Sequence, residues 1–188
     1  MHFIKVCQVW VSHQNYQIGG SGHIVEIDEA KIGKRKHNKG RTVTGQWVFG
    51  GIDRTTKQIF VEPVENRTSD TLLEVIKRKI ANNTTIYSDC WKSYNCLKNE
   101  GFFHCTVNHK YNFLDPTSGA HTQNIERVWR DMRAAIPKYG IRKKHYFGYL
   151  AEFLFKRFHN YDNRIEGFFR AMATMYSIKI DDYLYTSE

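Results

Sequence analysis

Residues 23–29 read His-Ile-Val-Glu-Ile-Asp-Glu, an apolar and β-branched run that contains two carboxylates, Glu26 and Asp28. Such a run predicts a β-strand. Side chains two residues apart point to the same face of a strand, so Glu26 and Asp28 share one face and Val25 and Ile27 the other. A carboxylate in an apolar strand must be hydrogen-bonded, paired with a cation or bound to a metal. The stretch therefore predicts a strand whose two acids have partners elsewhere in the chain.

The segments on either side of this strand predict an α/β fold. Strands are expected at residues 23–29, 46–53, 58–65, 84–88 and 103–107, and the first three form an antiparallel meander. Helices are expected after the capping oxygens of residues 68–70, and at about 93–99, 123–136, 147–159 and 165–176. This order is typical of a ribonuclease-H-like fold, a mixed five-stranded sheet flanked by helices, here with extra C-terminal helices. No internal repeat or long linker divides the chain, so one domain is expected.

Composition agrees with a globular protein. The chain has 188 residues, of which 41% are hydrophobic and 25% charged, enough to bury a core. No run of about 18 apolar residues predicts a membrane span. Residues 1–11 are apolar, but His2, Lys5 and Gln8 interrupt them and no small-residue cleavage site follows. A secretory signal is therefore not expected.

The charge balance favours a polyanionic partner. Lys and Arg number 28 against 19 Asp and Glu, which gives a net charge of +9. Nucleic acid is the commonest partner of such a chain, although basic ribosomal and membrane-surface proteins share the excess.

Cysteine and histidine patterns argue against a zinc enzyme. The four cysteines form no C-x-x-C pair, and no H-x3-H or H-E-x-x-H occurs among the nine histidines. Reduced thiols in a cytosolic or nuclear protein are the expected state of the cysteines, which are Cys7, Cys90, Cys96 and Cys105.

Three acids are candidates for a metal site. Asp89 ends the fourth predicted strand, which neighbours the first in this fold, so Asp28 and Asp89 should come together. Two close carboxylates repel each other, and a divalent cation relieves the repulsion. Glu126 lies beside Ile125 at the edge of the apolar stripe of the helix 123–136 and could supply a third ligand. Three such oxygen ligands suit Mg²⁺ or Mn²⁺, which can activate an attacking hydroxyl and stabilise the leaving oxygen of a phosphodiester.

Each acid also has an ordinary structural explanation, which the sequence leaves open. The ordinary roles are a sheet hydrogen-bond network for Glu26, a turn for Asp28, a helix N-cap for Asp89 and an ion pair with Arg130 for Glu126. The basic run 34–41 can equally be a solvated turn.

Five ordered motifs resemble the DDE transposase domain of the ISXO-like bacterial insertion-sequence transposases and their eukaryotic Merlin-type relatives. They are Val-Glu-Ile-Asp-Glu at 25–29 followed by Lys-x-Gly-Lys-Arg-Lys at 31–36, Gly-x-Trp-Val-Phe-Gly-Gly at 45–51, Ser-Asp-Cys-Trp-Lys-x-Tyr at 88–94, Val-Asn-His at 107–109, and Gly-Ala-His-Thr-x-Asn-Ile-Glu-x-x-Trp at 119–129. The resemblance implies a domain at 19–160, a remnant segment at 1–18 and a C-terminal helix at 161–188 that packs on the same domain.

The resemblance also implies the site. Asp28, Asp89 and Glu126 match the catalytic, metal-binding acids, with Mg²⁺ or Mn²⁺ as cofactor. In some bacterial relatives an Asn replaces the third acid, which makes Asn124 an alternative. The remaining candidates are Glu26, His109, His121 and Arg133 as auxiliary residues, and Lys34, Arg35, Lys36, Lys39, Arg41 and Lys92 as DNA contacts. Arg133 stands where relatives often have Lys, and its planar fork binds phosphate differently.

The chemistry implied is hydrolysis of a phosphodiester at a transposon end, followed by attack of the freed 3′-hydroxyl on target DNA. The expected partners are transposon-end and target DNA and further copies of the chain on DNA, with no nucleotide cofactor and no membrane. Relatives usually carry an N-terminal DNA-binding region, whereas about 18 residues precede the matched part. A host-captured, non-transposing DNA-binding protein is therefore the alternative, and another ribonuclease-H-like nuclease is a third. The expected location is the nucleus in a eukaryotic host, or the cytoplasm and nucleoid in a bacterium.

Overall fold

The computed structural model describes residues 3–33, 45–89, 92–107, 121–139 and 141–184, with side chains as far as residue 176. The chain divides into two compact units, Tyr16–Lys143 and Met1–Asn15 together with Lys144–Glu188, and each is described by itself. The predicted limits of 18, 19 and 160 do not coincide with these bounds and stay a prediction.

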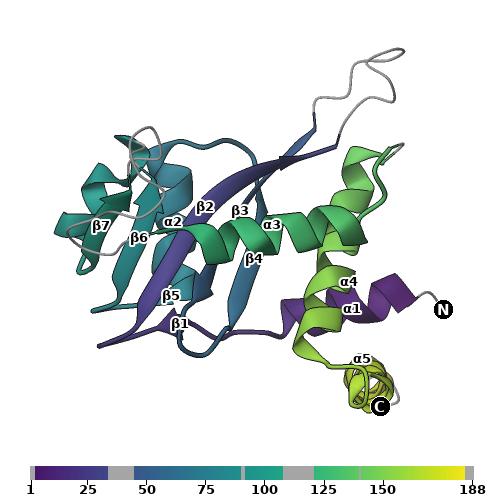
Figure 1. Ribbon diagram of the computed structural model, residues 1–188. Helices are drawn as coiled ribbons and strands as arrows, with labels where there is room; N and C mark the ends of the chain where they lie inside the picture. Colours follow the sequence, from purple (N-terminus) through teal and green to yellow (C-terminus); the bar gives the residue numbers. More distant parts are fainter. Residues whose placement is uncertain (1–2, 34–44, 90–91, 108–120, 140, 185–188) are drawn as a thin grey trace. The chain divides into compact units, whose positions relative to one another are not determined.

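The larger unit is built on a five-stranded mixed sheet (Figure 1). Its order is β4 (Ile59–Val64), β3 (Gln46–Asp53), β2 (Ile24–Ile32), β6 (Thr85–Asp89) and β7 (Phe103–Val107). The first three strands in the chain, β2, β3 and β4, pair antiparallel, whereas β6 pairs parallel to both β2 and β7. This is the ribonuclease-H-like arrangement, and it confirms the predicted meander and the predicted neighbours β2 and β6.

One face of the sheet packs on α2 (Ser69–Lys79) and the 3₁₀ helix η2 (Lys92–Asn99). Thr68 caps α2, because its side chain accepts the Thr71 N–H. The core on this face combines apolar residues of strands and helices, among them Val25, Ile27, Phe49, Leu72, Ile76, Tyr94 and Leu97.

The other face is crossed by α3 (Gln123–Ala135) (Figure 1). Its apolar stripe is buried, as the sequence predicts, and consists of Ile125, Val128, Trp129 and Met132. Gly50 allows the close approach of this helix, since a Cβ there would lie 2.6 Å from the Trp129 ring and 2.7 Å from the Phe60 carbonyl oxygen. Gly50 is also the β3 partner of Asp28 in the sheet register. Residues that carry the α3 packing therefore adjoin a predicted site residue.

Short elements depart from the prediction. A two-residue parallel pair, β1 (Ile18–Gly19) with β5 (Ile80–Ala81), was not predicted, and Ile80 begins β5 although its spacing suits the preceding helix. Strand β2 continues to Ile32, three residues beyond the predicted end. Pairs and extensions of this kind depend on contacts with distant strands, which no local pattern contains.

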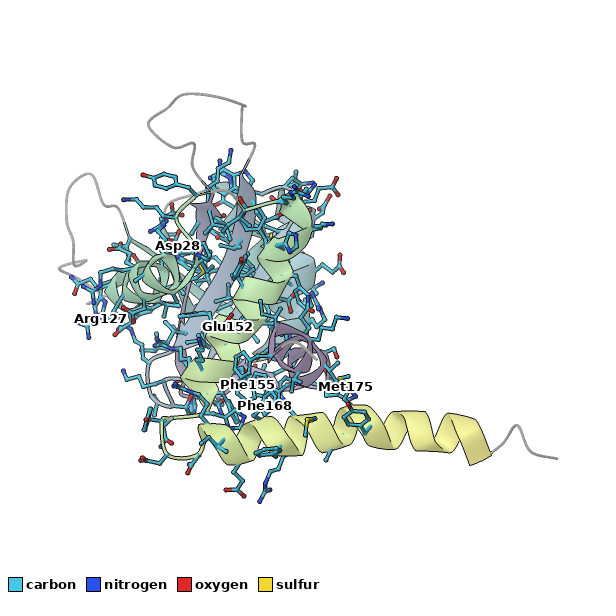
Figure 2. The ribbon with its side chains drawn as sticks, turned by 90° about the vertical axis from the view of Figure 1, so that its right-hand side faces the viewer. Asp28, Arg127, Glu152, Phe155, Phe168 and Met175 are labelled. Carbon is cyan, nitrogen blue, oxygen red and sulfur yellow. The ribbon has the colours of Figure 1, made fainter. Side chains whose placement is uncertain are left out.

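The smaller unit consists of α1 (Phe3–Ser12), α4 (Tyr146–Phe158) and α5 (Arg164–Leu184). A short 3₁₀ helix, η3 (Lys143–His145), precedes α4. The Phe3 ring lies 5.7 Å from Phe155 and 5.3 Å from Phe168, between centroids, and Figure 2 shows Phe155 and Phe168 where α4 meets α5. The two C-terminal helices agree with the prediction, but α1 was not predicted, because apolar residues occupy most of its length.

Cys7 lies in the core of this unit, and burial raises the pKa of its thiol to about 12. Cys96 and Cys105 are free thiols as well, whereas Cys90 lies outside the described residues. The reduced state of the cysteines stays a prediction. Within the described part of the chain, no helix combines the length and the apolar character that crossing a membrane requires.

Candidate active site

Asp28 and Asp89 come together where β6 ends beside the middle of β2. The last register pair between β2 and β6 is Glu26 with Tyr87, and the two aspartates each lie two residues further along. The alternation of strand side chains puts both on the α3 face. The charge of Asp89 contributes to the raised pKa of Asp28, as expected of carboxylates that are close together.

Asp28 is also held by α3. The indole N–H of Trp129 donates to Asp28 Oδ2 at 2.9 Å, and Figure 2 shows Asp28 beside this helix. The pKa of Asp28 is raised to about 7, chiefly by burial. Hydrogen bonds from Trp129 and the Glu29 backbone lower this pKa, whereas the charges of Glu29 and Asp89 raise it further. Near neutral pH, Asp28 therefore keeps a proton far more readily than an ordinary carboxyl unless a cation compensates its charge.

A pH-dependent stability difference follows for Asp28→Asn in metal-free protein. Below pH 3.8, the ordinary pKa of this carboxyl, folded and unfolded chains both hold the proton and the charge has no effect. As the pH rises to about 7, only the unfolded chain loses it, so the wild type loses stability relative to the variant. We expect Asp28→Asn to be more stable by about 4 kcal/mol at pH 8, or roughly 10 °C in Tm.

Thermal unfolding of both proteins from pH 4 to 8 with a chelator present measures this difference. A gap between the two Tm values that stays constant over the whole range would contradict the assignment to Asp28.

Glu26 has the structural role that the sequence left open. Its side chain is 0% exposed, and Oε1 accepts from Arg54 Nε at 2.7 Å and from Asn124 Nδ2 at 2.6 Å. Its Oε2 accepts the backbone N–H groups of Asn124 and Ile125 at 2.8 and 3.0 Å. Glu26 thus satisfies N–H groups that the first turn of a helix leaves unpaired. Asn124, the alternative to Glu126 as the third site residue, donates its side-chain amide to the same network.

Glu126 lies on the first turn of α3, and its side chain is exposed. Its Oε1 accepts from Thr122 Oγ1 at 3.3 Å. No three His, Cys, Asp or Glu side chains of the described residues are grouped closely enough to bind a metal ion. The structure therefore brings Asp28 and Asp89 together but does not place Glu126 in a three-acid cluster with them.

His121 lies beside the Glu26 network. Its Nδ1 is 3.5 Å from Glu26 Oε1, and its carbonyl oxygen accepts from Arg54 Nη2 at 3.0 Å. Burial and the neighbouring Arg54 charge lower the pKa of His121, against the opposing charges of Glu26 and Glu126. His121 is thus close to the candidate site and favours its neutral form.

Arg133 is exposed on the last turn of α3 and lines a cavity of about 310 Å³. The cavity lies between the end of β2 on one side and the end of α3 with the residues that follow it on the other. Lys31 and Lys138 line the same cavity, with Ile32, Ile136 and Pro137 as its apolar wall, and none of the described residues that line it is acidic. This arrangement suits an anion such as a phosphate.

Several predicted site residues lie outside the described residues. They are His109 and the DNA-contact candidates Lys34, Arg35, Lys36, Lys39 and Arg41. Lys92 begins η2, but its side chain is not described.

Arg54 and Trp129 were not predicted as site residues. The sequence reads Arg54 as part of a turn and Trp129 as core. A cationic partner is one way to satisfy a buried glutamate in a strand, but the sequence offers 28 Lys and Arg and no means to choose among them.

Comparison with known proteins agrees with the resemblance in the sequence. Residues 19–160 match the family of ISXO2-like transposase domains. The chain belongs to this family. An "uncharacterized transposase-like protein" of Haemophilus influenzae is 30% identical over 96 residues, which are 50% of this chain and 76% of that protein. The predicted family is thus confirmed, and the site described above belongs to an ISXO2-like transposase domain.

The chain is also similar to chains of solved structures, among them a viral intasome and an integrase core domain. One is a chain of the simian T-cell lymphotropic virus intasome in complex with PP2A regulatory subunit B56 gamma, with 19% sequence identity and a TM-score of 0.48. The match covers 74% of the present chain and about half (49%) of the intasome chain. The catalytic core domain of BIV integrase has 14% identity and a TM-score of 0.48, with 84% of this chain and 99% of that one covered.

Proposed function

We propose that this chain is the catalytic domain of a DDE-type DNA transposase that cleaves a phosphodiester at a transposon end and transfers the freed strand. The observation that carries the proposal is the convergence of Asp28, on β2, and Asp89, the last residue of the adjacent parallel strand β6, in a chain of the ISXO2-like transposase family. The net charge of +9 supports DNA as the substrate.

The donor chemistry of this pair fits a divalent cation. The charge of Asp89 adds to the raised pKa of the buried Asp28, a repulsion that a hard cation between the two carboxylates would relieve, and Mg²⁺ and Mn²⁺ prefer oxygen ligands. Asp28 and Asp89 would hold the ion, with Glu126 as the third acid from α3. A bound ion would supply Lewis-acid stabilisation of charge on the phosphate and activate the attacking hydroxyl.

The chain's own residues prepare the substrate for this chemistry. Trp129 fixes the orientation of the Asp28 carboxylate through its 2.9 Å hydrogen bond, and the rigid packing of α3 on Gly50 holds the indole in place. The cations that line the cavity at the end of β2 would bind DNA phosphates and orient the strand.

Salt-dependent DNA binding tests the role of this cavity. Lys31→Gln, Arg133→Gln and Lys138→Gln are each expected to weaken duplex binding and to reduce the slope of log K against log[salt] by about 1, because each removes one phosphate contact. Lys57→Gln, at an exposed turn outside the cavity, is the matched control. Equal slopes of log K against log[salt] for all four variants and the wild type would show that the cavity does not contact DNA.

The proposed function is tested by nicking of supercoiled plasmid in Mn²⁺ and in Mg²⁺. Wild-type protein should convert supercoiled plasmid to the nicked form, and a chelator should stop the reaction.

The exposed position of Glu126, outside a three-acid cluster, favours one alternative, a host-captured protein that binds DNA without cutting it. DNA binding without nicking in either metal would support that alternative. Assembly of several copies on DNA, a Merlin-type origin and nuclear location in a eukaryotic host are further parts of the main proposal.

A further inference from the structure

The Glu26 carboxylate connects strand β2 directly to the first turn of α3. The two elements are far apart in the chain, yet Glu26 bonds the backbone N–H groups of both Asn124 and Ile125. Arg54, which follows β3, bonds Glu26 through Nε and the His121 carbonyl through Nη2. The start of α3 is therefore fixed by main-chain contacts, which leave the helix little freedom to slide or rotate.

These contacts surround the residues on which the proposed chemistry depends. Glu26 lies two residues before Asp28 on β2, and the bonded Ile125 directly precedes Glu126 on α3. A second connection, from Trp129 to Asp28, lies one turn further along the helix. Two carboxylates of β2 thus contact α3, Glu26 at the first turn and Asp28 one turn further along. Together these contacts determine the separation between Glu126 and Asp28.

We propose that Glu26, together with Arg54, is a positioning residue that sets where α3 presents Glu126 relative to Asp28 and Asp89. This inference rests on the proposed function, and it assigns to Glu26 no contact with substrate or metal. Both of its oxygens are already bonded, and its side chain is fully buried.

A positioning role differs from a structural one in what its loss does to the reaction. A structural residue costs stability, and the folded fraction of a variant keeps its normal turnover. A positioning residue lowers the turnover of the folded enzyme itself, since a displacement of about 1 Å costs roughly 100-fold in rate.

The test compares Glu26→Gln with Ile76→Ala under saturating Mn²⁺, well below the Tm of either variant. Gln keeps the size of the side chain but adds an N–H group where the oxygens accept main-chain N–H groups. Ile76→Ala removes core packing from α2, on the opposite face of the sheet, and serves as a control that destabilises without touching α3. Arg54→Lys is the second variant if Glu26→Gln does not fold, because it leaves the carboxylate in place and removes the bond to His121.

We expect Glu26→Gln to lower kcat for plasmid nicking about 100-fold with little change in KM for DNA, while Ile76→Ala keeps kcat. Calorimetric Mn²⁺ affinity should fall in Glu26→Gln, because Glu126 is displaced from the ion, and should stay close to wild type in Ile76→Ala. Amide hydrogen exchange at Asn124 and Ile125 should accelerate in Glu26→Gln only.

A wild-type kcat in folded Glu26→Gln, or an equal fall of kcat in Ile76→Ala, would overturn the positioning role of Glu26. The proposed function would still stand in that case, provided that the wild-type protein nicks plasmid. Absence of nicking in the wild type would overturn the proposed function itself.

Discussion

Asp28→Asn is expected to reduce plasmid nicking by about 1,000-fold or more, while the folded structure is retained. The amide oxygen of Asn can still accept the Trp129 N–H, so the packing of α3 is preserved. The amide carries no charge, however, and binds Mg²⁺ or Mn²⁺ far less strongly than a carboxylate does. Asp89→Asn should have an effect of the same size, since the two side chains share one site.

Single-turnover nicking of supercoiled plasmid, with far-ultraviolet circular dichroism to verify folding, measures this loss. Glu74→Gln is a useful comparison, because Glu74 is an exposed carboxylate of α2, which packs on the opposite face of the sheet. An Asp28→Asn variant that is folded and nicks DNA at the wild-type rate would exclude Asp28 as a catalytic residue.

Glu26→Ala is expected to destabilise the protein by about 3–5 kcal/mol, one of the largest effects of any single substitution in this chain. The substitution leaves the Arg54 guanidinium without its carboxylate in a partly buried place and removes the acceptor of two helix N–H groups. For a chain of this length, the loss corresponds to a fall of roughly 10 °C in Tm.

The double variant Glu26→Gln/Arg54→Met separates the charge imbalance from the lost hydrogen bonds. Because it removes both charges, it should recover part of the stability that Glu26→Ala loses. Chemical denaturation of the three proteins gives the comparison. A loss below about 1 kcal/mol in Glu26→Ala would show that the network around Glu26 contributes little to the fold.

The strands and their neighbours were largely predictable, because short apolar runs and their separating turns are local features. The element order places β2 beside β6, and the structure confirms it. The proximity of Asp28 to Asp89 follows from that order alone. Helix α3 was equally clear, since its buried residues recur at helical spacing.

The partners of these acids could not be predicted. Glu26 had two readings, a hydrogen-bond network or a metal role, and its main partners come from a turn after β3 and from the start of α3, both distant in the chain. The position of Glu126 depends on how α3 is rotated on the sheet, which the apolar stripe determines only within a range. Helix α1 was missed because it is apolar on most sides, so that burial rather than periodicity gives it a place beside α4 and α5.

The most direct test of the account is calorimetric titration of Mn²⁺ into the wild type, Asp28→Asn and Asp89→Asn, each verified to be folded. The account predicts that the wild type binds Mn²⁺ and that either substitution removes the binding, because both carboxylates hold one ion. Mn²⁺ binding of equal strength in all three proteins, or no binding in any of them, would contradict a metal site at Asp28 and Asp89.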